Sequence, residues 1–420
     1  MTPKKTNHAE GRLFQSRLSE ILDPSNKLLL LADLTDWKSL EDALSSYFTR
    51  DRGASGKPIR LVAGILMLQH MSGLSDEQVV IGWVQNPYWQ YFCGYDYLQW
   101  TFPLDPSSLS RWRKRLGKEG LEKILQATLR VALDLKITKE ESFASVIVDT
   151  TVMIKNIAYP TDAKLYFKGI QLLVKEAKWE GITLRQTYTF LSKKALRKAH
   201  QYAHARQMKR AKKEIKRLHT YLGRVHRDIH RQIEGKVKKR LLPLLKITEK
   251  LLLQKREDKD KIYSLHEPAV ECITKGKAHK KYEFGCKASL VLTHKEGLAL
   301  CVNAHHGKPY DGHTLQNCLD QAEKLTGKVV KRGFVDKGYR GHMVKGAEIY
   351  ITGRRGLTRH YKKLLNRRQA IEPHIGHMKS EGKLGCNYLK GRLGDHLNAV
   401  LCAIGHNLRM ILRRMHPHPV

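Results

Sequence analysis

The sequence predicts an α/β fold in which a mixed sheet is flanked by helices. Two short apolar runs, at residues 146–148 and 333–335, are each followed by an aspartate, as central buried strands often are. Residues 282–292 alternate along a strand, and a short turn leads to a partner strand at residues 298–302. Another strand is expected at residues 348–352. With helical patterns between them, the order is strand, helical insertion, hairpin, helix, two strands and helix.

An N-terminal helical domain is expected over residues 1–140. The segment that starts at Ser75 has the pattern of a capping box, which opens a helix, and Pro87 ends that helix. Asp105 is expected to cap a second helix, which ends at Gly117.

This second helix shows a buried stripe and a basic outer face. Leu109, Trp112 and Leu116 recur at helical spacing and are expected in the core. The other face carries Arg111, Arg113, Lys114 and Arg115. Such a helix favours DNA contact, although ordinary surface helices show the same pattern. Trp112 and the aromatic residues between Trp83 and Tyr91 are interpreted as core rather than as stacking platforms for bases.

The charge of the chain indicates a polyanionic partner. Its 77 Lys and Arg residues exceed its 40 Asp and Glu residues, which gives a net charge of +37. A basic surface gains free energy by releasing counterions from nucleic acid, so double-stranded DNA is the expected ligand. The density is highest in a basic helical insertion expected at residues 160–265, where Lys193 to Lys261 holds 24 basic and 7 acidic residues. Apolar residues at helical spacing favour an ordered hairpin there.

The insertion divides the sheet-forming core into residues 141–159 and residues 266–420. Within the second part, Asp311 is expected to cap a helix that runs to about Leu325. Residues 393–415 are expected to form an apolar and basic helix that packs on the core.

Several classes of protein are disfavoured by what the sequence lacks. The polar start at residues 1–7 predicts no signal peptide, and no apolar run is long enough to span a membrane. The seven cysteines form no Cys-x-x-Cys pair, which favours reduced thiols in a cytoplasmic protein without a structural zinc site. No phosphate-binding glycine motif is present, so no nucleotide cofactor is expected.

Glu372 lies in a helical pattern that also carries two cations. At 3.6 residues per turn, Arg368 and Lys379 fall on the same face as Glu372. An acid between two cations indicates a site for phosphate and metal. Pro373 is expected to bend the helix or to start it, because proline lacks a backbone donor.

Three carboxylates are predicted to converge. Asp149 and Asp336 follow the two apolar runs and should emerge at the edge of the sheet, where ligands of α/β sheets bind. The 35 residues between Asp336 and Glu372 are enough for a turn, a strand and entry into a helix. Three crowded acids repel one another unless hard divalent cations neutralise them. The group therefore predicts a two-metal site for phosphoryl transfer.

The segments at residues 149–151, 336–341 and 367–379 resemble the DDE-type transposases of bacterial insertion sequences. Supporting similarity is found at residues 160–165, 266–268, 275–285 and 309–314. The resemblance implies an RNase H-like catalytic core in which Asp149, Asp336 and Glu372 bind Mg²⁺, or Mn²⁺ in its place. It also implies that the enzyme binds terminal inverted repeats through the N-terminal domain and joins a 3′-hydroxyl to target DNA. Two element ends need two active sites, so a homodimer on DNA is expected.

The resemblance assigns phosphate contacts to four cations: Arg368, Lys379, Lys337 and Arg340. The Tyr-x2-Arg-x3-Glu-x6-Lys signature of related transposases matches at its arginine, glutamate and lysine. Its tyrosine position holds Leu365, and Tyr361, one turn earlier, is a candidate substitute.

Other functions remain open at this point. An RNase H-like structure-specific or repair nuclease would share the three acids but release free ends without joining strands. A basic DNA-binding protein without catalysis would need none of them. His374 and His377 near Glu372 suggest a zinc hydrolase only weakly, since the spacing is not His-Glu-x-x-His. His305 and His306 are expected in a loop that contacts phosphate or solvent.

Overall fold

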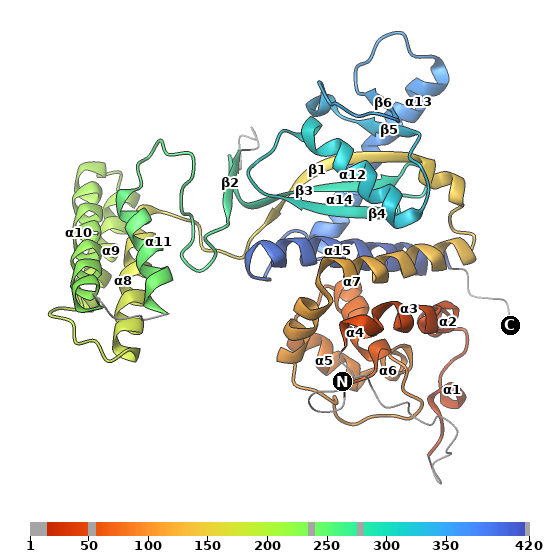
Figure 1. Cartoon of the computed structure of the whole chain (residues 1–420), viewed down its shortest axis with the longest axis horizontal. Coiled ribbons are helices and arrows are strands. Elements are labelled where there is room, and N and C mark those ends of the chain that lie inside the picture. Colours follow the sequence, from red (N-terminus) through yellow and green to blue (C-terminus); the bar gives the residue numbers. More distant parts are fainter. Residues whose placement is uncertain (1–14, 49–55, 234–239, 275–280, 416–420) are drawn as a thin grey trace. The chain divides into compact units, whose positions relative to one another are not determined.

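The computed structural model describes residues 15–48, 56–233, 240–274 and 281–415. The polar start at residues 1–7 and part of the family-like segment at residues 275–285 lie outside these ranges. The chain divides into two compact units, Met1–Ile154 with Cys286–Val420 and Lys155–Gly285. Figure 1 shows the elements of both units.

The N-terminal part of the first unit is helical, as predicted. Its elements are α1 (Leu18–Ile21), α2 (Lys27–Leu34), α3 (Trp37–Leu44), η1 (Ser45–Tyr47), α4 (Ile59–Ser72), α5 (Asp76–Gln85), α6 (Pro87–Phe92) and α7 (Ser107–Asp134). The capping box at Ser75 is confirmed, because its hydroxyl accepts from Gln78 N while the Gln78 side chain accepts from Ser75 N. Pro87 follows the end of α5 and opens α6.

Helix α7 confirms the stripe of Leu109, Trp112 and Leu116, all of which are buried. Gly117 breaks the helical path with φ 61° and ψ −167°, and the helix then resumes. The expectation that Arg113 lies on the outer face is wrong. Its side chain is 3% exposed and donates to Asp76 Oδ1 at 2.9 Å and to Gln69 Oε1 at 3.1 Å. A half-buried acid on α5 thus holds one basic residue of the face inward.

A mixed sheet forms the core that carries the three acids. Its strands are β1 (Ser145–Ile154), β3 (Tyr282–Thr293), β4 (Ala299–His305), β5 (Arg332–Val335) and β6 (Glu348–Ile351). Strand β3 lies between β1 and β4, and β5 lies between β1 and β6. The hairpin of β3 and β4 is antiparallel, whereas β5 is parallel to both β1 and β6. The predicted strand order and mixed sheet are therefore confirmed.

Strand β1 is longer than its apolar run. Asp149 lies within the strand, which continues to Ile154, so the expectation that the strand ends at this aspartate is wrong. The pairing of β1 with β5 ends at Ile147 and Phe334. Beyond that point β1 continues beside β3, whose Phe284 carbonyl accepts from Lys155 N. Asp149 therefore lies on β1 just beyond the point where the pairing of β1 with β5 ends.

Further helical elements belong to the first unit, besides the 3₁₀ turn η2 (Glu140–Ala144) that precedes β1. They are α12 (Asp311–Thr326), α13 (Arg359–Arg367), η4 (Arg368–Ala370), α14 (Ile371–Ser380) and α15 (Gly391–Arg414), with the short turn η3 (Lys337–Tyr339) after β5. Helix α15 is the predicted C-terminal helix and packs against α4, α7 and β4. Gly405 permits the close approach to α4, because a Cβ there would lie 2.2 Å from the His70 carbonyl oxygen.

The second unit contains the helices expected in the basic insertion. They are α8 (Asp162–Trp179), α9 (Thr189–His204), α10 (Met208–Ile233) and α11 (Leu241–Leu253), and strand β2 (Glu271–Thr274) pairs with the start of β3. Their core includes Leu218, Leu222 and Val225, as the helical spacing predicts. The unit, Lys155–Gly285, extends beyond residues 160–265 at both ends and includes β2 and the start of β3. In the described part of the chain, every helix is too short or too polar to cross a bilayer.

Candidate active site

The three predicted carboxylates come from three elements of the first unit. Asp149 lies on β1, Asp336 caps η3 directly after β5, and Glu372 lies in the first turn of α14. The predicted break near Pro373 is present, because α13 and α14 are joined by the 3₁₀ turn η4. Pro373 falls in the first turn of α14, where its missing backbone donor costs nothing.

Arg368 joins two of the three acids. Its guanidinium lies 3.4 Å from Asp149 Oδ2 and 3.9 Å from Glu372 Oε1. The Arg368 side chain is only 11% exposed, whereas that of Glu372 is 69% exposed. The spacing of four residues on one helical path, noted in the sequence, brings Arg368 and Glu372 together. The buried cation therefore offsets part of the negative charge at this site.

Asp149 lies within electrostatic range of Asp336 and Glu372, although in the described structure the carboxylate oxygens of the three acids do not all lie within 4.8 Å of one another. The pKa of Asp149 is raised to about 6, chiefly by burial and also by the charges of Asp336 and Glu372. The Thr150 N–H, which donates to Asp149 Oδ1 at 2.7 Å, and Arg368 lower the pKa. Burial and neighbouring acids both disfavour the ionised carboxylate. A bound cation would stabilise the charged form of such a carboxylate.

A fourth acid lies beside Asp336. Asp336 Oδ1 accepts from Gly338 N at 2.8 Å. A Cβ at Gly338 would lie 3.0 Å from that oxygen and 3.7 Å from Asp311 Oδ2. Asp311 had been expected to cap α12, but Tyr310 occupies the cap position and Asp311 accepts from Lys287 Nζ at 2.9 Å instead. The sequence offered only the family-like segment at residues 309–314 as a signal for this placement.

Tyr339 lies beneath the acids and was missed by the sequence reasoning. The residue is fully buried, and its hydroxyl has no hydrogen-bond partner among the described residues. Its pKa is raised well above the ordinary value by burial, and then by Asp149 and Asp311. Position 339 is in the family-like segment 336–341, which was the only signal available.

The other cations predicted to bind phosphate differ in exposure. Lys337 and Arg340 follow β5 and are exposed, while Lys379 on α14 is half-buried. Arg368 is engaged with the carboxylates of Asp149 and Glu372.

The position of the missing signature tyrosine is occupied by a core residue. Leu365 is buried in a cluster with Phe334 and Tyr350. Tyr361 stacks on Tyr350, with ring centroids 4.8 Å apart. The ring of Tyr361 is thus part of the packing around β6.

The histidines are arranged differently from the expectation. His305 accepts from or donates to Ser289 Oγ at 2.9 Å, and burial lowers its pKa to about 4. His305 ends β4, so its expected placement in a loop is wrong, whereas His306 lies in the loop after β4, with its Nε2 3.6 Å from Asp395 Oδ2. His374 packs edge-on against His406, and His377 pairs with Glu381 at 2.8 Å. In the described structure, His374 and His377 thus face different partners.

Comparisons with known proteins agree with the resemblance. Residues 16–115 match a family described as a transposase domain, and residues 254–408 match one described as a transposase DDE domain. The second match contains Asp336 and Glu372, while Asp149 lies between the two matches. A protein of Rhizobium meliloti, described as uncharacterized protein ORF8 in the nfe locus, is 44% identical over 207 residues, which are 49% of this chain and 100% of that protein. No solved structure matches the chain.

Proposed function

Because this chain belongs to the DDE-type transposases of insertion sequences, which are metal-dependent DNA-processing enzymes, we propose that it cuts the ends of its element and joins them to target DNA. The observation that supports this most directly is the convergence at Arg368. One buried guanidinium contacts Asp149 and Glu372, and Asp336 acts on the same Asp149 carboxylate. These contacts support the proposal that three segments far apart in sequence supply acids to one site.

Asp149, Asp336 and Glu372 would hold two Mg²⁺ ions, with Mn²⁺ as the second candidate. The residues fit hard cations, because they offer carboxylate oxygens and because burial has raised the pKa of Asp149. Bound metal would activate the attacking water or 3′-hydroxyl and stabilise the leaving oxygen. Asp336 keeps one oxygen on Gly338 N, which fixes the orientation of its carboxylate.

The basic residues would neutralise phosphate. Lys337, Arg340 and Lys379 lie on the segments that carry Asp336 and Glu372. Bound cations would replace Arg368 as the partner of the carboxylates. The Arg368 guanidinium would then be able to bind the phosphate at the cleavage site.

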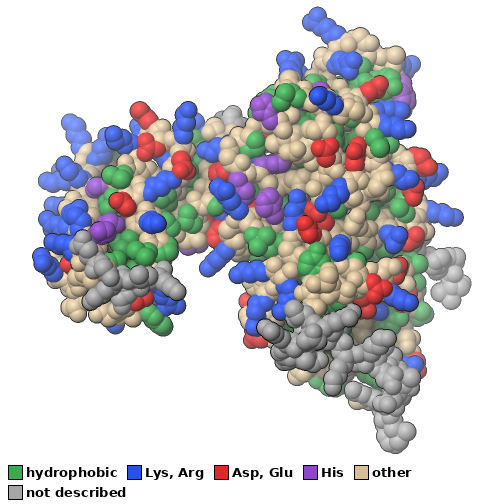
Figure 2. Space-filling model, viewed as in Figure 1, with side chains coloured by type: hydrophobic (Ala, Val, Ile, Leu, Met, Phe, Trp, Pro, Cys, Tyr) green, Lys and Arg blue, Asp and Glu red, His purple; other side chains and the backbone are tan. Residues whose placement is uncertain are grey.

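The second unit would bind DNA that flanks the cleavage site. Figure 2 shows Lys and Arg side chains crowded on its visible face. The exposed basic residues of α10 are Lys209, Arg210, Lys212, Lys213, Lys216, Arg217, Arg224, Arg227 and Arg231. Its two acids, Glu214 and Asp228, are buried. A helix whose acidic side chains are buried and whose Lys and Arg side chains are exposed can bind a phosphate backbone. The N-terminal helices would recognise the inverted repeats, and a homodimer would hold two ends.

A strand-transfer assay tests the proposal. Purified protein is mixed with labelled DNA carrying the inverted repeats and with a target plasmid, in Mg²⁺ and in Ca²⁺. We expect cleaved ends and joined products in Mg²⁺, and bound but uncut DNA in Ca²⁺. Asp336→Asn should bind the ends as wild type does and cut them at least about a hundredfold more slowly, because it removes one metal ligand.

The alternatives give different products. Free ends that are never joined would identify a nuclease, and equal DNA function in wild type and Asp336→Asn would identify a non-catalytic binding protein. The matched control is Asp320→Asn, which changes an exposed carboxylate on α12 and should leave the reaction unchanged.

A further inference from the structure

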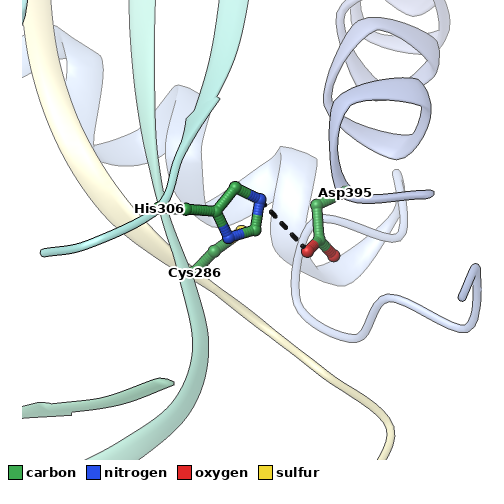
Figure 3. A group of neighbouring side chains, drawn as sticks. All are labelled: Cys286, His306 and Asp395. Carbon is green, nitrogen blue, oxygen red and sulfur yellow. Dashed lines mark ion pairs between the residues drawn. The ribbon is translucent and has the colours of Figure 1, made fainter. Parts of the chain in front are cut away.

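A second group of metal-ligating side chains lies apart from the three acids in the first unit. Cys286 is on β3, His306 directly follows β4, and Asp395 is on α15. Their ligand atoms all lie within 4.8 Å of one another. Figure 3 shows the imidazole of His306 facing the Asp395 carboxylate, with Cys286 beside the ring. Cys286 and Asp395 are buried and His306 is half-buried.

We propose that Cys286, His306 and Asp395 bind a zinc ion that fastens α15 to the β3–β4 hairpin. Thiolate, imidazole and carboxylate are the three side-chain ligands that zinc takes in proteins. Mg²⁺ prefers oxygen ligands only, so the ion at this site differs from the ions at the three acids.

The separation of His306 and Asp395 fits a shared ion better than a direct hydrogen bond. Their facing atoms, Nε2 and Oδ2, are 3.6 Å apart. Nitrogen and oxygen joined by a hydrogen bond lie about 2.7–3.2 Å apart. Two ligands that are each about 2.1 Å from a tetrahedral ion lie about 3.4 Å apart. A zinc ion can therefore be placed between the two side chains with little rearrangement.

The surroundings hold the Asp395 carboxylate in a ligating orientation. Asn387 Nδ2 donates to Asp395 Oδ1 at 2.7 Å, and Asn387 is itself 1% exposed. The backbone N–H of Asn387 donates to the Ile154 carbonyl, which fixes Asn387 against the end of β1. One carboxylate oxygen is thus engaged while the other faces His306. Hydrogen bonds of this kind orient the ligands of known metal sites.

A candidate for a fourth donor lies near His306, outside the group of three. The ring of His396 is 5.8 Å from that of His306, measured between centroids. His396 Nδ1 is buried and has no hydrogen-bond partner in the described part of the chain. A tetrahedral zinc ion needs a fourth ligand, which His396 can supply.

One other interpretation is weaker, and one nearby positive charge must be considered. A Cys-His-Asp group also resembles the arrangement of a nucleophilic cysteine, but Cys286 is 1% exposed and no substrate can reach it. Lys118 brings a positive charge into the neighbourhood, since it lowers the pKa of His396 after the larger effect of burial. Glu122, 3.5 Å from Lys118 Nζ, offsets this charge.

Metal analysis of the full-length protein tests the site. The chain is purified, dialysed against metal-free buffer and analysed for zinc by mass spectrometry. We expect about one zinc per chain in wild type. Cys286→Ser should lower the zinc affinity by at least tenfold, whereas Cys272→Ser, on β2, and Asp336→Asn, at the three acids, should retain it.

Cobalt substitution provides a readout that needs no variant. Wild type loaded with Co²⁺ should show the charge-transfer absorption of a thiolate ligand and the visible bands of a tetrahedral ion, and added zinc should raise its melting temperature. Wild-type protein that binds neither Zn²⁺ nor Co²⁺ would overturn the proposal, as would equal zinc affinity in wild type and Cys286→Ser. If Cys286→Ser does not fold, Asp395→Asn is measured in its place. None of these readouts depends on DNA cleavage, so their failure is distinct from failure of the proposed function.

Discussion

In the absence of metal, burial and Arg368 have opposite effects on the pKa of Asp149: burial raises it and Arg368 lowers it. Burial disfavours the charge of Asp149, and only Arg368 and the Thr150 N–H support it. This balance makes the acid site a source of instability in the metal-free protein. Sites that bind cations commonly carry such unfavourable charge until the cation is present.

The stability of the metal-free protein should therefore fall as the pH rises. The pKa of Asp149 is about 6 in the folded chain and ordinarily 3.8. Between about pH 4 and pH 6 the folded chain keeps a proton that the unfolded chain has lost, so the free energy of unfolding decreases across that window, by up to about 3 kcal/mol.

Denaturant titrations at several pH values, with a chelator present, measure this effect. Asp149→Asn should be more stable than wild type at pH 7 and equally stable at pH 4, and Mg²⁺ should reduce the difference. The exposed Asp42→Asn is the control. A wild-type stability that rises between pH 4 and pH 6 relative to Asp149→Asn would contradict the assignment.

The ion pair of the buried Arg113 and the half-buried Asp76 gives a second prediction at this scale. Arg113→Met should lower the free energy of unfolding by about 3 kcal/mol, because it leaves Asp76 beside Gln69 without its cation. Adding Asp76→Leu should restore part of the loss. Lys114→Ala, on the exposed side of α7, should change stability by less than about 0.5 kcal/mol. Equal effects of Arg113→Met and Lys114→Ala in thermal unfolding would show that the pair is not formed.

At the scale of elements, the contact between α15 and α4 joins the sheet to the N-terminal helices. Gly405 allows it, since a Cβ there would meet backbone atoms of His70 and Met71 rather than a movable side chain. Packing of two helices at such short range requires the absence of a side chain at the crossing.

Gly405→Ala should consequently destabilise the protein by at least about 2 kcal/mol in chemical unfolding. Gly376→Ala is the matched control, because a Cβ on that helical glycine of α14 would meet nothing within 4 Å. It should be neutral or stabilising by up to about 1 kcal/mol, as expected for alanine in a helix. A Gly405→Ala variant as stable as Gly376→Ala would mean that α15 can shift away from α4 at no cost.

The elements that local patterns specify were predictable from the sequence. The capping box at Ser75, the β3–β4 hairpin and the break before Pro373 follow from neighbouring residues alone. The length of β1 was not, because Asp149 interrupts its apolar pattern while β3 continues to pair with it. Strand pairing thus overrode the local signal.

The sequence was enough to propose the three acids of the candidate site, but not the side chains that surround them. Asp149, Asp336 and Glu372 follow recognisable patterns, and Arg368 shares a helical face with Glu372. The contact of Arg368 with Asp149, the pairing of Asp311 with Lys287 and the group around Cys286 depend on tertiary structure. No spacing rule joins residues from different strands and helices, so periodicity could not reveal them.

At the scale of the whole molecule, the charge of +37 should make DNA binding strongly dependent on salt. Changing Lys209, Lys212 and Lys216 of α10 to Gln should reduce the slope of log affinity against log salt by about 0.9 for each phosphate contact that is lost. Filter binding or fluorescence anisotropy at several salt concentrations measures the slope.

The control for this measurement changes three exposed lysines of the first unit: Lys324, Lys331 and Lys345. Both triple variants remove the same charge, so a general effect of net charge would lower both slopes equally. We expect a larger decrease in slope for the α10 variant. Equal slopes for the two variants would show that α10 is not part of the DNA-binding surface.

The place where the second unit is attached bears on how such proteins diversify. The chain enters that unit at Lys155 and leaves it near Phe284, and these two residues share a backbone hydrogen bond of 2.9 Å. The two chain segments that connect this unit of more than a hundred residues are thus hydrogen-bonded neighbours, as the two ends of a β-turn are. Related elements could exchange the whole module for a shorter or longer one, and so acquire new DNA contacts, while the acids are inherited unchanged.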